Sequence, residues 1–339
     1  MSKNNSNFQK MVIWVLLPVL LVSGCGVLPG AQDAMAVYSS GILQANQIKI
    51  AYESYGPTDR ESILLIGGTG NQLIDWPIEL VKELVGRGYR VIRFDNRDAG
   101  LSTIFSEAGY PDYAAVAAAM TSGKPASLPY TLEDMAADAV GLLEALQIPK
   151  AHIVGVSMGG AIAQIVALKY PEHTLSLTSL MADSGNPALP VSAKPKVLAA
   201  IPQMPAEGDR EAYIAYNVKV AQVIGSPNYP TDEATLREQA KLDVERSYQP
   251  VGLLRQQIVA LMGHLSGRNA QLKNIHVPTV VLQGSADPLV PVEAAQEIAN
   301  NIPGAELILI KGLGHDLPVQ LVGTIADAII KAARGPASQ

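Results

Sequence analysis

Short apolar runs alternate with helical patterns along the chain from Gly41 onward. Many of these runs are rich in β-branched residues and are bounded by Gly, Asp or Ser, which is typical of strands buried on both faces. Such alternation predicts an α/β fold, a mostly parallel eight-stranded sheet flanked by helices. The predicted strands are residues 42–45, 48–54, 62–66, 89–94, 152–156, 177–181, 279–283 and 306–310, and the main predicted helices are residues 77–87, 132–146, 158–170, 292–301 and 319–334.

One long region interrupts this alternation. Between about residues 183 and 274 there is no convincing strand pattern, and proline-rich pieces lead into helical patterns near 207–224, 232–247 and 251–265. A structureless loop of this length would be unusual inside a compact domain. We therefore expect a helical cap inserted into the sheet domain. The predicted division is a first core part at residues 39–182, a cap at 183–274 and a second core part at 275–335.

The amino terminus has the pattern of an export signal. Basic residues precede an apolar run at residues 11–22, which contains Pro18 and is shorter than the ~20 residues of a membrane span. This pattern predicts a signal peptide at residues 1–24 and a tether at 25–38. Residues 21–25, LVSGC, resemble the bacterial lipobox, which implies cleavage before Cys25 and acylation of its thiol. The alternative is an ordinary signal peptide that happens to end near a cysteine.

A lipidated Cys25 would make the protein an exported bacterial lipoprotein of the cell envelope, with its body in water and its acyl chains in a membrane. Cys25 is the single cysteine of the 339 residues, so a disulfide within the chain and a cysteine-based zinc cluster are excluded. The composition, with 48% hydrophobic and 17% charged residues, is that of a folded globular protein. With a net charge of −6 and no basic patch, nucleic acid is not an expected partner.

A serine lies in a sharp turn between a predicted strand and a predicted helix. Residues 155–159, GVSMG, match the G-x-S-x-G pattern of a nucleophile elbow, in which only small residues fit on either side of the turn. The pattern alone is weak, but here a strand precedes it and a helix follows it, as the motif requires. Ser157 is therefore the predicted nucleophile.

A serine nucleophile needs a histidine base and an acid that orients the ring. His315 is the candidate base, because it follows the last predicted strand in a glycine-containing loop. Asp287 is the candidate acid, because it follows the strand at 279–283 and its turn is stiffened by prolines. Asp183, at the end of an earlier strand, is the rival acid, and Asp316 is too close to His315 in sequence to orient the ring readily.

The developing oxyanion needs two N–H donors. We expect one from the backbone of Met158, directly after the nucleophile, and the other from the glycine-rich loop at residues 67–70. Within that loop Thr69 is the preferred donor and Gly68 is the alternative. The loop lacks the lysine and hydroxyl residue that would make it a phosphate-binding loop.

Together, several motifs resemble the α/β-hydrolase fold family and, within it, the aclacinomycin methylesterase-like esterases. These motifs are the Gly-Gly loop running to Trp76-Pro77, the segment DNRDAGLS at residues 95–102, the elbow at 155–159, and Gly314-His315 followed by Leu317-Pro318. The similarity covers about residues 41–335 and is weak across the cap. It implies a carboxylic ester hydrolase that needs no metal or cofactor, whereas the identity of the substrate depends on the cap.

Three functional hypotheses follow. The first is a serine hydrolase that cleaves a small-molecule carboxylic ester through an acyl-enzyme. The second is a lactonase, C–C hydrolase or perhydrolase on the same scaffold. The third, favoured least because the triad residues are all present, is a catalytically inactive surface lipoprotein. The stripe of Tyr213, Tyr216, Val220 and Val223, at helical spacing in the cap, is expected either to pack against the core or to line an acyl pocket. The sequence does not determine the oligomeric state.

Overall fold

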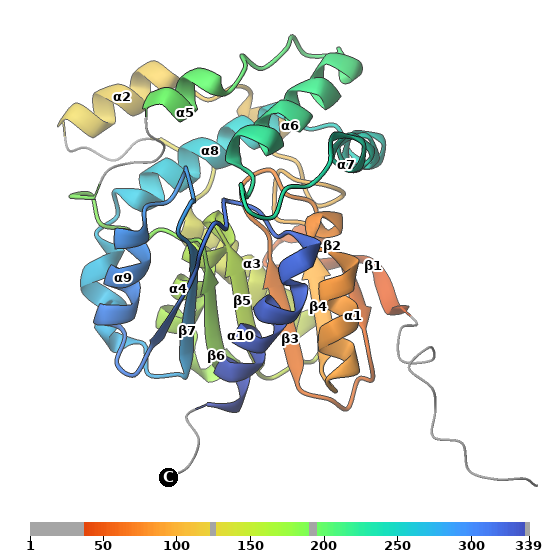
Figure 1. Cartoon of the computed structure of the whole chain (residues 1–339), viewed down its shortest axis with the longest axis vertical. Coiled ribbons are helices and arrows are strands. Elements are labelled where there is room, and N and C mark those ends of the chain that lie inside the picture. Colours follow the sequence, from red (N-terminus) through yellow and green to blue (C-terminus); the bar gives the residue numbers. More distant parts are fainter. Residues whose placement is uncertain (1–36, 123–126, 190–194, 336–339) are drawn as a thin grey trace, which may run out of the picture.

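An eight-stranded sheet forms the centre of the protein (Figure 1). The computed structural model describes residues 37–122, 127–189 and 195–335. Along the sheet the strand order is β1-β2-β4-β3-β5-β6-β7-β8. The first two strands form an antiparallel hairpin, β2 runs antiparallel to β4, and the other neighbours are parallel. The strands are β1 (Val37–Ala45), β2 (Ile48–Tyr55), β3 (Ser62–Ile66), β4 (Arg90–Phe94), β5 (Ala151–Val156), β6 (Thr174–Leu180), β7 (Thr279–Gly284) and β8 (Glu306–Ile310).

Helices cover both faces of this sheet, and each face has its own buried apolar cluster. Two helices lie on one face, α1 (Ile78–Gly86) and α10 (Val322–Arg334). Three lie on the other, α3 (Leu132–Ala145), α4 (Met158–Lys169) and α9 (Val292–Asn301). The mostly parallel α/β architecture predicted from the sequence is confirmed. The main differences are that β1 and β6 begin several residues earlier than predicted, and that the last helix opens with a 3-10 turn, η6 (Val319–Leu321).

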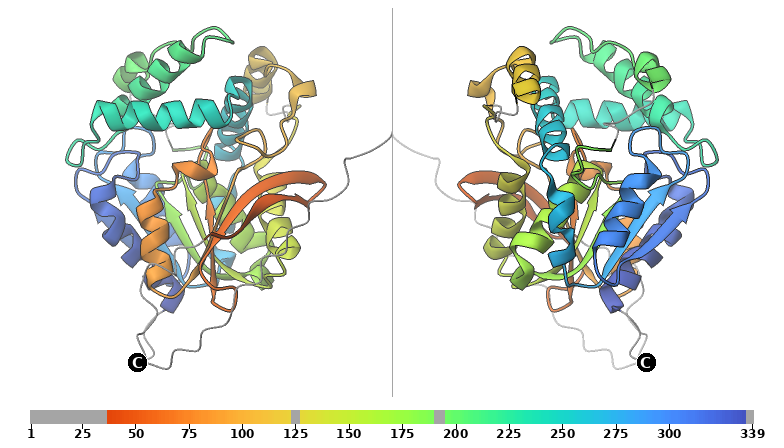
Figure 2. Two further views of the ribbon diagram at one scale, coloured as in Figure 1. Left: turned by 90° about the vertical axis from the view of Figure 1, so that its right-hand side faces the viewer. Right: turned by 90° about the vertical axis from the view of Figure 1, so that its left-hand side faces the viewer.

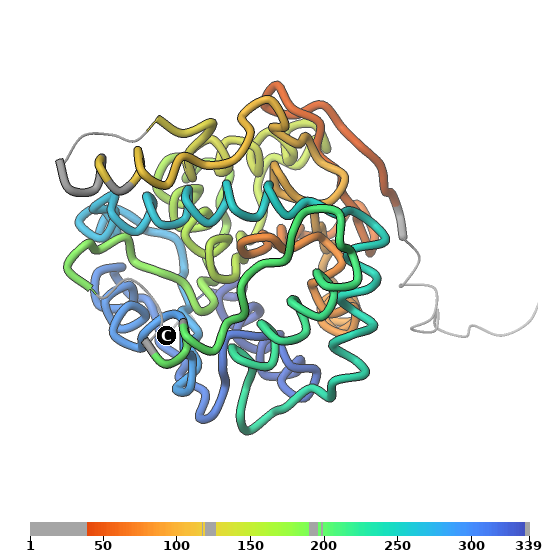
Figure 3. Tube along the Cα trace, turned by 90° about the horizontal axis from the view of Figure 1, so that it is seen from above, coloured from red at the N-terminus to blue at the C-terminus, as the bar shows by residue number. Residues whose placement is uncertain are grey.

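A second layer of helices lies above the carboxyl ends of the parallel strands (Figures 1 and 2). Viewed from above, α8 crosses the middle of this layer, with α2 along one side and α6 and α7 on the other (Figure 3). The helices of the layer are α2 (Tyr113–Ser122), α5 (Pro195–Ala200), α6 (Arg210–Ile224), α7 (Glu233–Arg246) and α8 (Pro250–His264). Three of them, α6, α7 and α8, correspond to the helical patterns predicted for the cap.

Two elements differ from the expected cap. The helix α2 comes from the segment between β4 and α3, and its alanine-rich sequence, YAAVAAAMTS, lacks the polar face that would have indicated an amphipathic helix. The 3-10 helix η5 (Arg268–Asn274) lies within the predicted cap range, yet it packs against α4 and α9 beside the sheet, and its Leu272 is buried in the core cluster of that face. The remaining 3-10 helices are η2 (Leu73–Asp75), η3 (Ser106–Ala108) and η4 (Pro171–His173).

Candidate active site

Ser157 occupies a strained turn between β5 and α4. Its backbone has φ 56° and ψ −123°, a region that residues with a side chain rarely adopt. The Ser157 N–H donates to the Leu180 carbonyl at 2.9 Å, which fixes the turn to the neighbouring strand. A Cβ atom on Gly155 would collide with the Gly159 carbonyl, and one on Gly159 would collide with the end of β3. The small residues of the motif are therefore required by space.

The structure brings Ser157, His315 and Asp287 together in one hydrogen-bonded chain. The Nε2 atom of His315 lies 3.0 Å from the Ser157 Oγ atom, and its Nδ1 atom lies 2.8 Å from Asp287 Oδ2. The histidine comes from the loop after β8 and the aspartate from the loop after β7. Residues separated by 158 positions in the sequence thus meet at one edge of the sheet.

The Asp287 carboxylate is fully buried and held from several directions. Its Oδ1 atom accepts the backbone N–H groups of Leu289 and Val290 at 2.8 and 2.9 Å. Its Oδ2 atom, which contacts the imidazole, also accepts the Gln283 side-chain amide at 3.0 Å. These bonds leave the carboxylate a single direction in which to present Oδ2, so the tilt of the His315 ring is fixed.

The rival acid Asp183 and the rejected Asp316 are both bonded to other partners. Asp183, after β6, pairs with the His264 Nδ1 atom and with Arg268. Burial acts to raise the pKa of Asp183, but its bonds to His264 and the charge of Arg268 hold that pKa below the ordinary value. Asp316 accepts a hydrogen bond from the Ser226 hydroxyl, and burial raises its pKa.

The glycine-rich loop after β3 passes directly beside the serine. A Cβ atom on Gly68 would lie 3.2 Å from the Ser157 Cβ atom and 3.3 Å from the Val156 carbonyl oxygen. The side-chain amide of Asn96 donates to the Gly67 carbonyl at 3.0 Å and ties the start of the loop to the end of β4. Thr69 and Met158 border the same cavity as Ser157. The backbone positions expected to supply oxyanion donors therefore lie along the cavity that Ser157 also borders.

A cavity of about 1310 Å³ separates the sheet edge from the overlying helices. Ser157 and His315 lie on its floor side, and cap residues form its other walls. The side chains of Tyr213, Tyr216, Val220 and Val223 all border it. Tyr213 is at the same time buried against α7, in an apolar cluster with Val244. The stripe therefore borders the cavity, and where Tyr213 packs, it packs against another cap helix and not against the core of the sheet domain.

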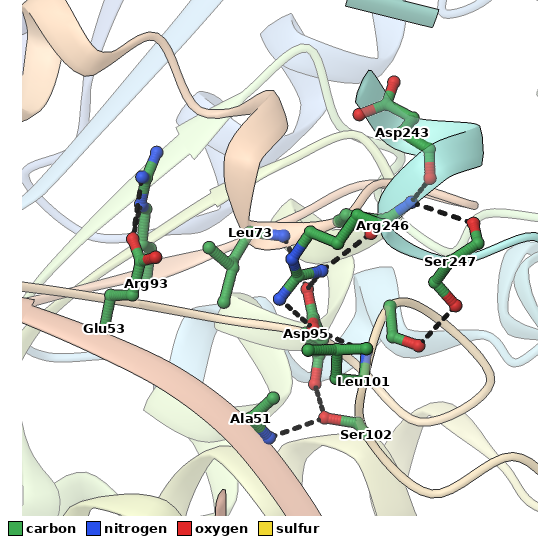
Figure 4. Close-up of polar contacts among 12 residues, drawn as sticks. Ala51, Glu53, Leu73, Arg93, Asp95, Leu101, Ser102, Asp243, Arg246 and Ser247 are labelled. Atoms are coloured by element: carbon green, nitrogen blue, oxygen red, sulfur yellow. Dashed lines mark hydrogen bonds and ion pairs between the residues drawn. The ribbon is translucent and has the colours of Figure 1, made fainter. Parts of the chain in front are cut away.

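Buried charges between the cap and the sheet domain were missed from the sequence. Arg246 of α7 pairs with the fully buried carboxylate of Asp95 at 2.7 Å, as Figure 4 shows. Nearby, Asp243 faces Asp75, and burial together with the charge of Asp75 raises the pKa of Asp243 to about 8. Burial also raises the pKa of Asp75. The sequence of α7, EATLREQAKLDVER, has the polar composition of a solvated helix, so it does not indicate these buried contacts.

Among residues 37–122, 127–189 and 195–335 no group of three or more His, Cys, Asp or Glu side chains is arranged to hold a metal ion. Within the same ranges no helix has both the length and the apolar character needed to cross a membrane. The predicted signal peptide, Cys25 and most of the predicted tether lie outside the described residues.

The chain belongs to the α/β-hydrolase fold family. The model of that family, described as the alpha/beta hydrolase fold, matches residues 61–320, which include all three members of the hydrogen-bonded chain. This match confirms the family resemblance inferred from the motifs.

The chain is similar to proteins named as a methylesterase, a depolymerase and an enol-lactonase. The chain is 29% identical to a rhodomycin D methylesterase of Streptomyces peucetius over 309 residues, which is 85% of this chain and 96% of the relative. It is 31% identical to a poly(3-hydroxyalkanoate) depolymerase of Ectopseudomonas oleovorans over 60% of this chain and 68% of the relative. Its fold matches that of an enol-lactonase from Burkholderia xenovorans with a TM-score of 0.65, 17% identity and coverage of 87% of this chain and 100% of that one. The family and the methylesterase relatives together support a carboxylic ester hydrolase.

Proposed function

We propose that this protein is a serine hydrolase that cleaves a small-molecule carboxylic ester through an acyl-enzyme intermediate. The observation that carries the proposal is the hydrogen-bonded chain from Ser157 through His315 to Asp287, placed on a strained turn at the floor of a large cavity. Geometry of this kind is the requirement for an activated serine nucleophile.

In the proposed reaction His315 Nε2 takes the proton of the Ser157 hydroxyl as Oγ attacks the ester carbonyl carbon. The negative charge on the carbonyl oxygen is stabilised by the N–H of Met158 and by that of Thr69, with Gly68 as the alternative donor. The alcohol leaves with the proton from His315, and an acyl group remains on Ser157. Water then repeats the sequence and releases the acid. Asp287 stabilises the imidazolium in both halves and keeps Nδ1 protonated.

The relatives support the ester chemistry without determining the substrate. The name of the methylesterase describes ester cleavage by that protein. The structural neighbour is an enol-lactonase, but at 17% identity it supports the fold alone. Because the cap supplies most of the cavity wall, we propose that its apolar stripe contributes to acyl selection.

We also propose that the enzyme is held at a membrane of the bacterial envelope by acyl chains on Cys25. The support is the lipobox-like sequence LVSGC after an apolar run, with a short segment between it and β1. Export, cleavage of the signal peptide and lipidation of Cys25 would leave the catalytic domain in water beside the membrane.

A fluorophosphonate probe tests the mechanism directly. We expect the wild type to be labelled at Ser157, as read by mass spectrometry of the peptide, and to hydrolyse p-nitrophenyl butyrate. A matched Ser157→Ala protein with an unchanged melting temperature should show neither reaction. Labelling at another serine would contradict the assignment, and faster turnover of a lactone panel than of any linear ester would favour lactone opening on the same residues.

A further inference from the structure

One cap side chain holds the backbone of the glycine-rich loop beside Ser157. Gln256 of α8 is fully buried, and its Oε1 atom accepts the N–H of Gly70 at 2.6 Å. Its side-chain amide donates to the Arg97 carbonyl, also at 2.6 Å. A single side chain thus connects a cap helix, the loop after β3 and the loop after β4.

The hydrogen bond to Gly70 fixes the orientation of one peptide group. The Asn71 N–H donates to the Gly68 carbonyl at 3.2 Å, so residues 68–71 form a β-turn with Thr69 and Gly70 at its centre. Gly70 has φ +76°, and a positive φ at the third position is the signature of a type II turn. The alternative type I turn has the central peptide rotated by roughly half a turn. That rotation would aim the Thr69 carbonyl, instead of the Gly70 N–H, toward the Gln256 oxygen.

The other end of the loop is held by a second cap helix. Arg246 of α7 donates to the Gln72 side-chain oxygen at 2.7 Å and pairs with Asp95. The same Asp95 carboxylate accepts the Leu73 N–H at 2.7 Å, a contact drawn in Figure 4. The loop between β3 and η2 is therefore held by the cap at Gly70 and at Gln72, within a few residues of Gly68, which lies beside Ser157.

We propose that Gln256 is a positioning residue for the oxyanion-stabilising loop. By holding the peptide between Thr69 and Gly70, it keeps the turn at residues 68–71 in its type II form and so restricts the backbone of Thr69, whose N–H is the preferred oxyanion donor. The cap then contributes to stabilisation of the transition state in addition to shaping the substrate cavity. This inference rests on the proposed ester hydrolysis, because it assigns a purpose to the loop only in that reaction.

The test compares Gln256→Leu, which removes both hydrogen bonds, with Gln256→Glu and with the control Gln271→Leu at an exposed position of η5. Loss of one oxyanion donor costs about 10²–10³ in kcat elsewhere, and loss of its positioning should cost less, about 10–100-fold. We expect that fall in kcat for Gln256→Leu on p-nitrophenyl butyrate, with KM changed less than about threefold. The inhibition constant of butylboronic acid, which forms a tetrahedral adduct on serine, should rise by about the same factor as kcat/KM falls.

The glutamate variant separates positioning from simple packing. When its carboxyl group is protonated, the Gln256→Glu side chain can still accept from the Gly70 N–H and donate to the Arg97 carbonyl. The kcat of this variant, as a fraction of the wild-type kcat, should therefore be higher at pH 6 than at pH 8. A raised KM with unchanged kcat, an unchanged boronic acid constant, or a kcat loss in Gln256→Leu equal to that in the control would overturn the positioning role. Absence of turnover and of Ser157 labelling in the wild type would instead show that the proposed function is wrong, and the positioning role with it.

Discussion

Ser157 has a positive φ, a conformation that costs a residue with a side chain about 1–3 kcal/mol relative to an ordinary backbone. The strain is sustained because the Ser157 N–H is bonded to Leu180 and because α4 begins at the next residue, with the N–H of Gly160 donating to the Ser157 carbonyl at 2.9 Å. The result is a hydroxyl group that projects from the sheet edge toward His315. Strain at this residue is thus a means of presenting the nucleophile.

Replacing Ser157 with alanine should therefore abolish turnover while the fold persists. Loss of a serine nucleophile in a well-studied protease lowers kcat by about 10⁶-fold, and we expect a loss of that order here. Steady-state kinetics and the melting temperature, measured on the same preparation, check both statements. Residual turnover near the wild-type rate in a folded variant would be incompatible with the mechanism.

The acid can be identified by comparing Asp287→Asn with Asp183→Asn. In another serine hydrolase the equivalent change of the buried acid lowers kcat about 10⁴-fold, because the imidazole adopts the wrong tautomer, and Asp287→Asn should lose activity on this scale. Asp183→Asn should retain most activity and instead lower the melting temperature, because it leaves the buried Arg268 without its counter-ion. The opposite ranking would mean that Asp183 orients the base.

Each member of the hydrogen-bonded chain from Ser157 to Asp287 was predictable because it has a local trace in the sequence. Ser157 lies in a spaced glycine motif, Asp287 follows a strand and precedes prolines, and His315 follows the last strand. Gln256 and Arg246 leave no such trace. Their partners lie 186 and 151 residues away, and hydrogen bonds at that separation depend on how the cap is seated on the sheet. Local patterns therefore predict the chemistry better than they predict the residues that support it.

Among the elements, α7 makes its contact with the sheet domain through charged and polar side chains. Arg246 and Asp243 face Asp95 and Asp75, and the Gln239 amide donates to both Asp243 and Asp75 at 2.9 and 3.3 Å. A helix whose sheet-facing side is polar has little amphipathic contrast, which is why the sequence predicts its existence but not its orientation. The docking of α7 should accordingly respond to protonation more than the docking of an apolar helix would.

The Asp243–Asp75 pair determines whether stability rises or falls with pH. The pKa of Asp243 is raised from 3.8 to about 8 in the folded protein. The stability that protonated Asp243 contributes is therefore fully present below pH 3.8 and is lost progressively as the pH rises from there through 8. Asp243→Asn removes this dependence while preserving an acceptor for Gln239. Relative to wild type, the variant should thus gain free energy of unfolding between pH 5 and pH 8 in urea titrations. The control is Asp59→Asn, at a side chain that is 79% exposed. The prediction would be refuted if Asp243→Asn changed the free energy of unfolding by the same amount at pH 5 and at pH 8.

The two tyrosines of α6 should differ in what they control. Tyr213 is 8% exposed and packs against Val244, so Tyr213→Ala should destabilise the protein by about 3 kcal/mol, as large-to-small changes in a core do. Tyr216 borders the cavity and is less buried, so Tyr216→Ala should change the ratio of kcat/KM between short and long acyl esters by about tenfold, the effect of one or two methylene contacts. Melting curves and an acyl-length series distinguish the two. A uniform rate loss in Tyr216→Ala would make it a packing residue as well.

For the molecule as a whole, the proposed lipid anchor should determine location and leave catalysis unchanged. Cys25→Ser should remove the protein from the membrane fraction or leave its signal peptide uncut, and a shortened protein starting at Met35 should be soluble with unchanged kcat/KM. Fractionation with a high-salt wash and mass spectrometry of the mature amino terminus provide the measurement. A processed Cys25→Ser protein that still sediments with membranes would rule out the acyl anchor.

The position of β1 determines where on the domain such an anchor would attach. Val37 pairs with Tyr55, and Tyr55 pairs with Val91, near the amino end of β4, whereas the cavity lies beyond the carboxyl ends of the parallel strands. The segment from Cys25 to Val37 reaches roughly 40 Å at full extension. An anchor there would attach to the domain at the end away from the cavity, and we expect the enzyme to take monomeric esters from the aqueous phase. Its rate would then depend on the free substrate concentration and not on the mole fraction of substrate in a bilayer, the opposite of interfacial lipase kinetics.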